Sequence, residues 1–135
     1  MGKVLIIYSE KKDFTEFAEA LKLGFTKQGV EVEMQNLKAP SRPINFKKYD
    51  LVLAGSPIFG FFGGKIDEDL AEFLKDCKNT VGQKAVAFVD SKFIGSSKSL
   101  KKVMAKLESI GCMVYDFRSF SDVKTAEKFA KKFAL

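Results

Sequence analysis

The chain has 135 residues, of which 46% are hydrophobic and 14 are Phe, and its formal net charge is +6 at pH 7. This length and apolar content predict one folded domain over residues 1–135 and exclude a disordered chain. No apolar run approaches the ~20 residues that a membrane-spanning helix needs, and no cleavage site follows the first strand, so a cytoplasmic protein is expected.

The His and Cys content limits the kinds of catalytic and metal sites that this chain can contain. The chain has no His, which excludes His-based triads and most zinc sites. Its two Cys residues, Cys77 and Cys112, form no metal or redox motif and are expected to be reduced structural thiols. Lysines lie on nearly every predicted helix, which indicates solvated faces or attraction to an acidic protein or an anionic ligand. No nucleic-acid-binding signature is present, and no nucleic acid or membrane partner is expected.

The first third of the chain alternates strand and helix. An apolar run predicts a buried strand over Lys3–Tyr8, and helical spacing of apolar residues predicts a helix over Phe14–Gln28. Alternating polar and apolar residues over Val30–Leu37 predict a half-exposed strand at a sheet edge. The connector Lys38–Lys48 shows no helical pattern.

The middle of the chain repeats this pattern. A second apolar strand is predicted over Tyr49–Ser56, and a loop rich in Gly and Phe follows over Pro57–Lys65. A helix is predicted over Ile66–Asp76 and a further apolar strand over Lys84–Asp90.

The last third adds a loop, a helix, a strand and a helix. They are predicted over Ser91–Ser97, Lys98–Ser109, Met113–Phe117 and Asp122–Phe133, with Ser121 or Asp122 capping the last helix. Five strands joined by helices predict an α/β fold with three layers, α/β/α, around a doubly wound parallel sheet.

Ligands of such sheets bind beyond the carboxyl ends of the strands, where the strand order reverses. Three loops qualify: Ser9–Phe14, Ser56–Lys65 and Asp90–Ser97. The second holds three Phe residues over 59–62, which can stack on a flat ligand, fold back as a lid, or pack against a second subunit in a homodimer. In the third, Ser96 or Ser97 is a candidate helix N-cap.

The element order and the run Gly55-Ser56-Pro57-Ile58-Phe59-Gly60 resemble the flavodoxin family, and the resemblance continues through Asp67, Leu70 and Phe73-Leu74. It implies the strand order 2-1-3-4-5 and bound FMN, with the first loop around the phosphate and the other two loops around the isoalloxazine ring. Phe59 and Phe93 then match the two ring-stacking positions. The cofactor-binding residues implied are Ser9, Glu10, Lys11, Lys12, Asp13, Phe14, Ser56, Pro57, Ile58, Phe59, Gly60, Asp90, Ser91, Phe93 and Gly95.

The first loop departs from the family's Ser/Thr-x-Thr-Gly-x-Thr pattern. It keeps Ser9 but has Lys11 for Thr and Lys12 for Gly, and Asp13 and Phe14 fill the last two positions. Lys12 therefore carries a Cβ where a positive φ is expected. The spacing of Asp13 and Glu16 predicts that Asp13 caps the helix, which sets a carboxylate beside the phosphate, while Lys11 and Lys12 offset its charge.

Other occupants of similar folds fit poorly. A response-regulator receiver needs a phosphorylatable Asp where Ser56-Pro57 stands, and the glycines of the second loop lack dinucleotide-binding spacing. Cys112 and Arg118 match the C-x5-R spacing of small phosphatases, but the residues between them read as a strand.

The sequence therefore predicts an FMN-binding redox protein that serves a partner protein or reduces a small acceptor, with the flavin carrying the chemistry. The alternative is a domain of the same fold that has lost FMN and serves as an interaction or other ligand-binding module.

Overall fold

A computed structural model describes residues 2–38, 43–60, 62, 64–91 and 95–135. Its five strands and four helices follow one another in the predicted order. They are β1 (Lys3–Tyr8), α1 (Thr15–Thr26), β2 (Glu31–Asn36), β3 (Leu51–Ser56), α2 (Glu68–Lys75), β4 (Lys84–Asp90), α3 (Ser96–Ser109), β5 (Met113–Phe120) and α4 (Val123–Ala130).

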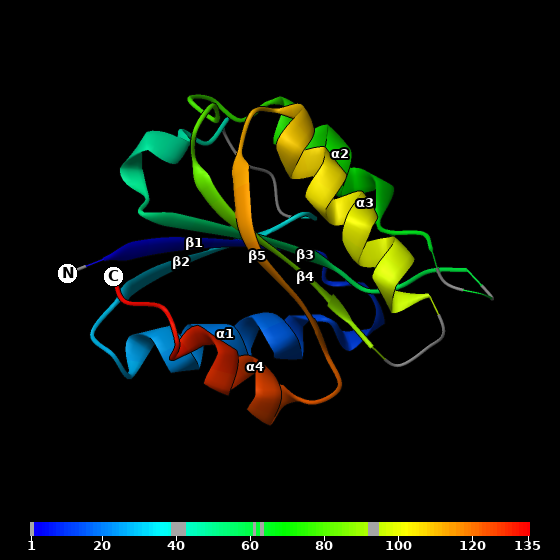
Figure 1. The fold of residues 1–135 in the computed structure, drawn as a ribbon, viewed down its shortest axis with the longest axis horizontal. Helices are drawn as coiled ribbons and strands as arrows, with labels where there is room; N and C mark the ends of the chain where they lie inside the picture. The colour runs from blue at the N-terminus through cyan, green and yellow to red at the C-terminus, as the bar shows by residue number, and fades with distance from the viewer. Residues whose placement is uncertain (1, 39–42, 61, 63, 92–94) are drawn as a thin grey trace.

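All neighbouring strands pair in parallel, in the order β2-β1-β3-β4-β5. α1 and α4 cover one face of this sheet and α2 and α3 cover the other (Figure 1). The three-layer architecture and the strand order expected from the sequence are therefore confirmed. The carboxyl ends of β1, β3 and β4 point to the same end of the molecule, which is where the candidate loops begin.

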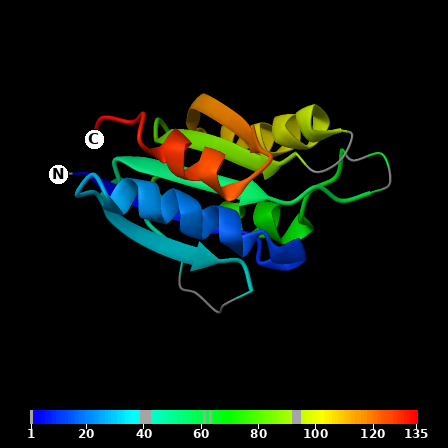
Figure 2. The same ribbon diagram turned by 90° about the horizontal axis from the view of Figure 1, so that it is seen from below.

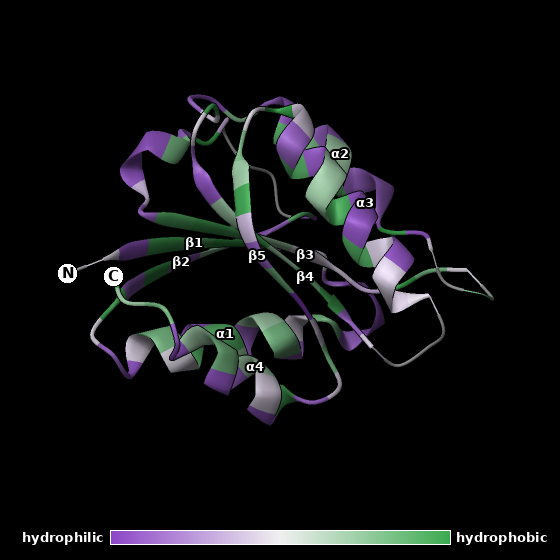
Figure 3. Cartoon of the chain, viewed as in Figure 1, coloured by the Kyte–Doolittle hydropathy of each residue, from purple (hydrophilic) through white to green (hydrophobic). Residues whose placement is uncertain are grey.

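Alternate residues of the strands supply the two hydrophobic cores. Ile6 of β1 faces α1 and α4, whereas Ile7 faces α2 and α3, and β3 is buried along its whole length. The hydropathy colouring shows the apolar strands between helices whose outer faces are polar (Figure 3). Burying both faces of central parallel strands explains why β1, β3 and β4 read as continuous apolar runs.

The helices α1 and α4 lie side by side, in front of the sheet in the view of Figure 2. Gly24 permits this approach, because a Cβ there would lie 2.4 Å from the Glu127 carbonyl oxygen and 2.8 Å from the Ala130 Cβ. A small residue at a helix crossing lets the two backbones come close.

Several element boundaries differ from the sequence-based expectations. A 3-10 turn over Phe46–Lys48 lies in the connector where no helix was expected, since Phe46 is buried and Asn45 caps the turn. β5 continues to Phe120, whose ring is buried against Phe129. Asp122 caps α4, as predicted, through the Thr125 amide at 2.8 Å.

The two cysteines are free thiols within the folded domain. Burial raises the pKa of the Cys112 thiol to about 11 and that of Cys77 to about 12. Both thiols are therefore protonated at neutral pH and unreactive as nucleophiles. None of the helices described is long and apolar enough to cross a membrane.

Candidate functional site

The three candidate loops are joined at the carboxyl ends of β1, β3 and β4. The Ser9 amide donates to the Gly55 carbonyl at 3.2 Å, which connects the first loop to the end of β3. The Ile58 amide donates to the Asp90 carboxylate at 3.3 Å, which connects the second loop to the end of β4. Residues from three separate parts of the sequence thus form one surface at the point where the strand order reverses.

The first loop contains two residues in the left-handed backbone region. Residues Lys11–Asp13 form a 3-10 turn in which φ is 54° at Lys12 and 58° at Asp13. A positive φ was expected at Lys12, and the structure extends it to the next residue. Each side chain costs about 1–2 kcal/mol in this region, because its Cβ crowds the backbone.

Asp13 does not cap α1, so this prediction from the sequence is wrong. The helix begins at Thr15 with Phe14 at the N-cap position, and no side chain among the described residues caps it. The left-handed backbone of Asp13 belongs to the preceding turn, whereas an N-cap carboxylate needs an extended backbone. The first amides of α1 are therefore not covered by the Asp13 carboxylate.

Phe14, one of the residues predicted to bind the cofactor, has its side chain inside the protein. Its ring is fully buried and stacks on Phe88, with centroids 5.3 Å apart. Its amide donates to the Lys11 carbonyl at 3.1 Å. The left-handed backbone of Lys12 and Asp13 keeps both residues out of the helix, which starts beyond Phe14. The other exposed members of the first loop remain the predicted ligand-facing residues.

Lys12 connects the first loop to the second. Its Nζ donates to the Ile58 carbonyl at 2.9 Å and lies 4.6 Å from the centre of the Phe59 ring. A lysine ammonium over an aromatic face is a favourable cation–π contact. The ammonium therefore lies beside the aromatic ring predicted to stack on a ligand.

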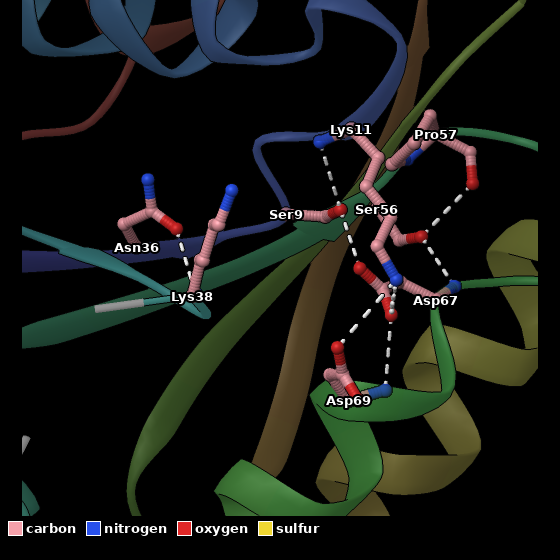
Figure 4. Close-up of polar contacts among 8 residues, drawn as sticks. All are labelled: Ser9, Lys11, Asn36, Lys38, Ser56, Pro57, Asp67 and Asp69. Atoms are coloured by element: carbon pink, nitrogen blue, oxygen red, sulfur yellow. Dashed lines mark hydrogen bonds and ion pairs between the residues drawn. The ribbon is translucent and has the colours of Figure 1, made fainter. Parts of the chain in front are cut away.

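Asp67 is the centre of a buried polar network (Figure 4). Its Oδ2 accepts a 2.6 Å hydrogen bond from the Ser9 hydroxyl, and its Oδ1 lies 3.2 Å from Lys11 Nζ. The amide of Asp67 donates to Ser56 Oγ at 2.8 Å, and its Oδ1 caps α2 through the Asp69 amide at 3.0 Å. Asp67 thus links the first loop and the start of α2 through its carboxylate, and the end of β3 through its backbone amide.

The environment of Asp67 keeps it ionised. Burial raises the pKa of its carboxyl, but hydrogen bonds from Ser9, from the Asp69 amide and from Lys11 outweigh burial and leave the pKa below its ordinary value. In the sequence, Asp67 is one of the residues that resemble the flavodoxin family, but no role was predicted for it. Its position before a helix signals an N-cap, whereas its bond to Ser9 joins residues 58 positions apart and has no local signal.

The second loop is anchored to α3. The Phe59 amide donates to the Lys65 carbonyl at 2.9 Å, and the Ser99 hydroxyl bonds to both the Gly64 amide and the Lys65 carbonyl. Phe59 is half-buried and Phe62 is 71% exposed, while Phe61 lies outside the described residues. Stacking on a ligand, closing as a lid and packing in a homodimer all remain predictions for these rings.

The second loop also contains Pro57 and Gly60. Pro57 is buried and its carbonyl accepts a 2.9 Å hydrogen bond from Ser56, whereas Gly60 is exposed with a φ of 89°. The positive φ at Gly60 is readily adopted only by glycine.

The third loop is described at both of its ends. Asp90 is buried. Ser91 is half-buried, and its amide donates a hydrogen bond to the Phe120 carbonyl at 2.9 Å. Gly95 directly precedes α3 and has a φ of 96°. Gly95 occupies the N-cap position, which corrects the expectation of Ser96 or Ser97 there. Phe93, the second predicted stacking residue, lies outside the described residues.

A groove of ≈ 890 Å³ opens beside these loops. It shares Lys11, Phe59 and Asp67 with the site and continues between α2 and α3. The α2 wall carries acidic residues and the α3 wall carries lysines, as in the pair Glu68 and Lys102. The part of the groove between α2 and α3 is thus lined by charged side chains, whereas Phe59 lies at the end next to the loops.

Comparison with solved structures identifies the fold. The chain matches Flavodoxin 1 from Bacillus cereus with a TM-score of 0.72 and 20% identity, covering 95% of this chain and 94% of that one. It matches Megasphaera elsdenii flavodoxin with a TM-score of 0.74 and 20% identity over 96% and 99% of the two chains. It also matches 34% of a flavodiiron protein from Giardia intestinalis, over 96% of its own length, with a TM-score of 0.70 and 17% identity. No family model and no curated protein matches the sequence.

Proposed function

We propose that this chain, which has the flavodoxin-like fold, binds FMN at its three loops and acts as a redox protein. The observation that carries the proposal is the meeting of these loops at the carboxyl ends of β1, β3 and β4, with Phe59 half-buried there. Electrons would pass to a partner protein or to a small acceptor, and the proposal includes a cytoplasmic location.

The aromatic end of the site fits a flat ring. Phe59 is held in place by the hydrogen bond from its backbone amide to the Lys65 carbonyl and by the Lys12 ammonium over the face of its ring. A rigid, half-exposed aromatic side chain is suited to stacking on a planar heterocycle. Phe59 would orient the ring, and the glycine-rich loop would exclude water from one side of it.

Two features at the other end fit the side chain of FMN. The N-terminus of α1 has no side-chain cap among the described residues, and helix amides with their dipole favour an anion. Glu10 Oε2 is buried without a hydrogen-bond partner among the described residues. A buried acceptor of this kind needs a donor, and the hydroxyl groups of a ribityl chain are donors.

A bound flavin would supply the electron transfer itself. The protein's residues would bind and orient it, and Lys12 would place a positive charge near the ring. The net charge of +6 favours a negatively charged redox partner through long-range attraction.

The test is a titration of purified protein with FMN, followed by flavin fluorescence and absorbance. Saturable binding is expected, and Phe59→Ala should weaken it by about tenfold, the loss expected for one stacking contact of ~1.4 kcal/mol. Phe117→Ala is the control, because Phe117 is a partly exposed Phe, 51% exposed, that lies on β5. Absence of binding at high micromolar FMN would refute the proposal.

The second candidate is an interaction or ligand-binding module without FMN. It is favoured by the contacts of Ser9 and Lys11, two residues predicted to hold phosphate, with the Asp67 carboxylate. Stoichiometric flavin in protein isolated from its native host would reject this candidate.

A further inference from the structure

We propose that Asp67 sets the ligand preference of the site, so that the phosphate of FMN adds little to binding and riboflavin binds about as tightly as FMN. The inference rests on the proposed function and concerns the phosphate end of the same site. The reason is that the contacts of Asp67 occupy hydrogen-bond donors that a phosphate would need.

The hydroxyl of Ser9 is committed to Asp67. Its single proton is donated to Asp67 Oδ2 at 2.6 Å, and its oxygen accepts the Lys11 amide at 3.3 Å. Ser9 is also fully buried. This hydroxyl is the one that the sequence retains from the phosphate-binding pattern, and it has no proton left for a phosphate oxygen.

The ammonium of Lys11 is committed in the same way. It lies 3.2 Å from Asp67 Oδ1 and 3.5 Å from Asp69 Oδ2. A phosphate would have to compete with two carboxylates for this charge. The partner at Asp67 is 1% exposed at its side chain, so water screens that ion pair weakly.

Asp67 is also fixed in position. Its amide bonds to Ser56 Oγ, and its Oδ1 caps α2 through the Asp69 amide. Rotation of the carboxylate away from an incoming anion would break the helix cap together with the bond to Ser9. A phosphate, which carries about −1.5 to −2 charges at pH 7, would therefore approach a fixed and buried negative charge.

Two opposing effects then act on the phosphate. The N-terminus of α1 attracts it, and the cluster of Asp67, Asp69 and Lys11, whose two carboxylates share one ammonium, repels it. A riboflavin molecule, which has the same ring and ribityl chain but no phosphate, experiences neither effect. Similar affinities for the two flavins follow from their near cancellation.

The experiment is calorimetric titration of flavin-free protein with riboflavin and with FMN. Wild-type protein is expected to bind both with dissociation constants within about threefold of each other. Asp67→Asn keeps the shape and the helix cap but removes the charge, and it should tighten FMN binding by about tenfold or more while changing riboflavin binding by less than about twofold. Glu72→Gln is the matched control, since Glu72 is also a carboxylate on α2 but pairs with Lys75 and is 75% exposed at its side chain; it should leave the ratio unchanged.

The outcomes separate the two proposals. A wild-type preference for FMN above about tenfold would overturn the role of Asp67 and keep the flavin site. Equal effects of Asp67→Asn on both flavins would overturn it as well. Absence of binding by either flavin to any of the three proteins would reject the proposed function itself. If Asp67→Asn fails to fold, the wild-type ratio still decides.

Discussion

The hydroxyl of Ser9 donates a 2.6 Å hydrogen bond to the carboxylate of Asp67, 58 positions further along the chain. Both residues are buried. The bond joins the residue after β1 to the residue before α2 and therefore holds the first loop against the start of that helix (Figure 4). We expect the stability of this end of the protein to depend on this contact.

Replacement of Ser9 by Ala should lower the free energy of unfolding by about 1.5–3 kcal/mol, because a buried carboxylate loses a hydrogen bond. Urea unfolding at pH 7 measures this change. Ser109→Ala is the control, since the Ser109 hydroxyl bonds to the Lys106 carbonyl at an exposed site. Its effect should stay within about 0.5 kcal/mol, and equal losses in the two variants would contradict the importance of the buried bond.

The same network makes stability depend on pH. The pKa of Asp67 is lower in the folded protein than its ordinary value, so its ionised form stabilises the fold at pH values above that ordinary value. This contribution is lost as the pH falls below about 4 and passes through the folded pKa. The difference in unfolding free energy between wild-type protein and Asp67→Asn should therefore shrink from pH 7 to pH 3. A difference that is unchanged over this interval would show that the ionised carboxylate does not stabilise the fold.

Gly55→Ala should destabilise the protein by about 1–3 kcal/mol through overpacking. A Cβ at this position would lie 2.4 Å from two ring atoms of Phe88, whose ring is itself stacked on Phe14. Thermal or urea unfolding measures the loss. In a Phe88→Leu background the added methyl group should cost less, because the ring is absent; the same cost in both backgrounds would rule out this clash as the cause.

The left-handed backbone at Asp13 leads to a further prediction. Asp13→Gly should be more stable than Asp13→Ala by about 1 kcal/mol, since glycine alone adopts a φ of 58° without a Cβ penalty. Asp13 is exposed, so few other contacts change. Urea unfolding of the two variants provides the comparison, and a more stable Ala variant would contradict the backbone assignment.

The strands were predictable because a strand that is buried on both faces appears in the sequence as an apolar run. β3 is buried at every position and β1 at nearly every one, so both read as apolar runs, and the run after Gly55 carries the resemblance that implied the strand order. The backbone strain at Lys12 was also predictable, since a glycine position of the family pattern holds a lysine.

The parts that sequence reasoning missed depend on contacts between distant residues. The spacing of Asp13 and Glu16 matched a helix cap, but Asp13 has a left-handed backbone in the preceding turn and the helix starts at Thr15, while the Phe14 ring stacks on Phe88. Asp67 gained its role from Ser9 and Lys11, which reach it only after β1 and β3 pair in the sheet. Local patterns carry no information about such pairs.

Mapping of backbone amide shifts by NMR during addition of FMN tests the central claim most directly, because it reports both binding and its location. If the flavin binds at the three loops, we expect saturable shifts at residues 9–13, 56, 58–60 and 90–91, with little change at Gly82 and Gln83, which lie at the opposite ends of the strands. Unchanged spectra at high micromolar FMN, or shifts confined to the ionic part of the groove between α2 and α3, would contradict it.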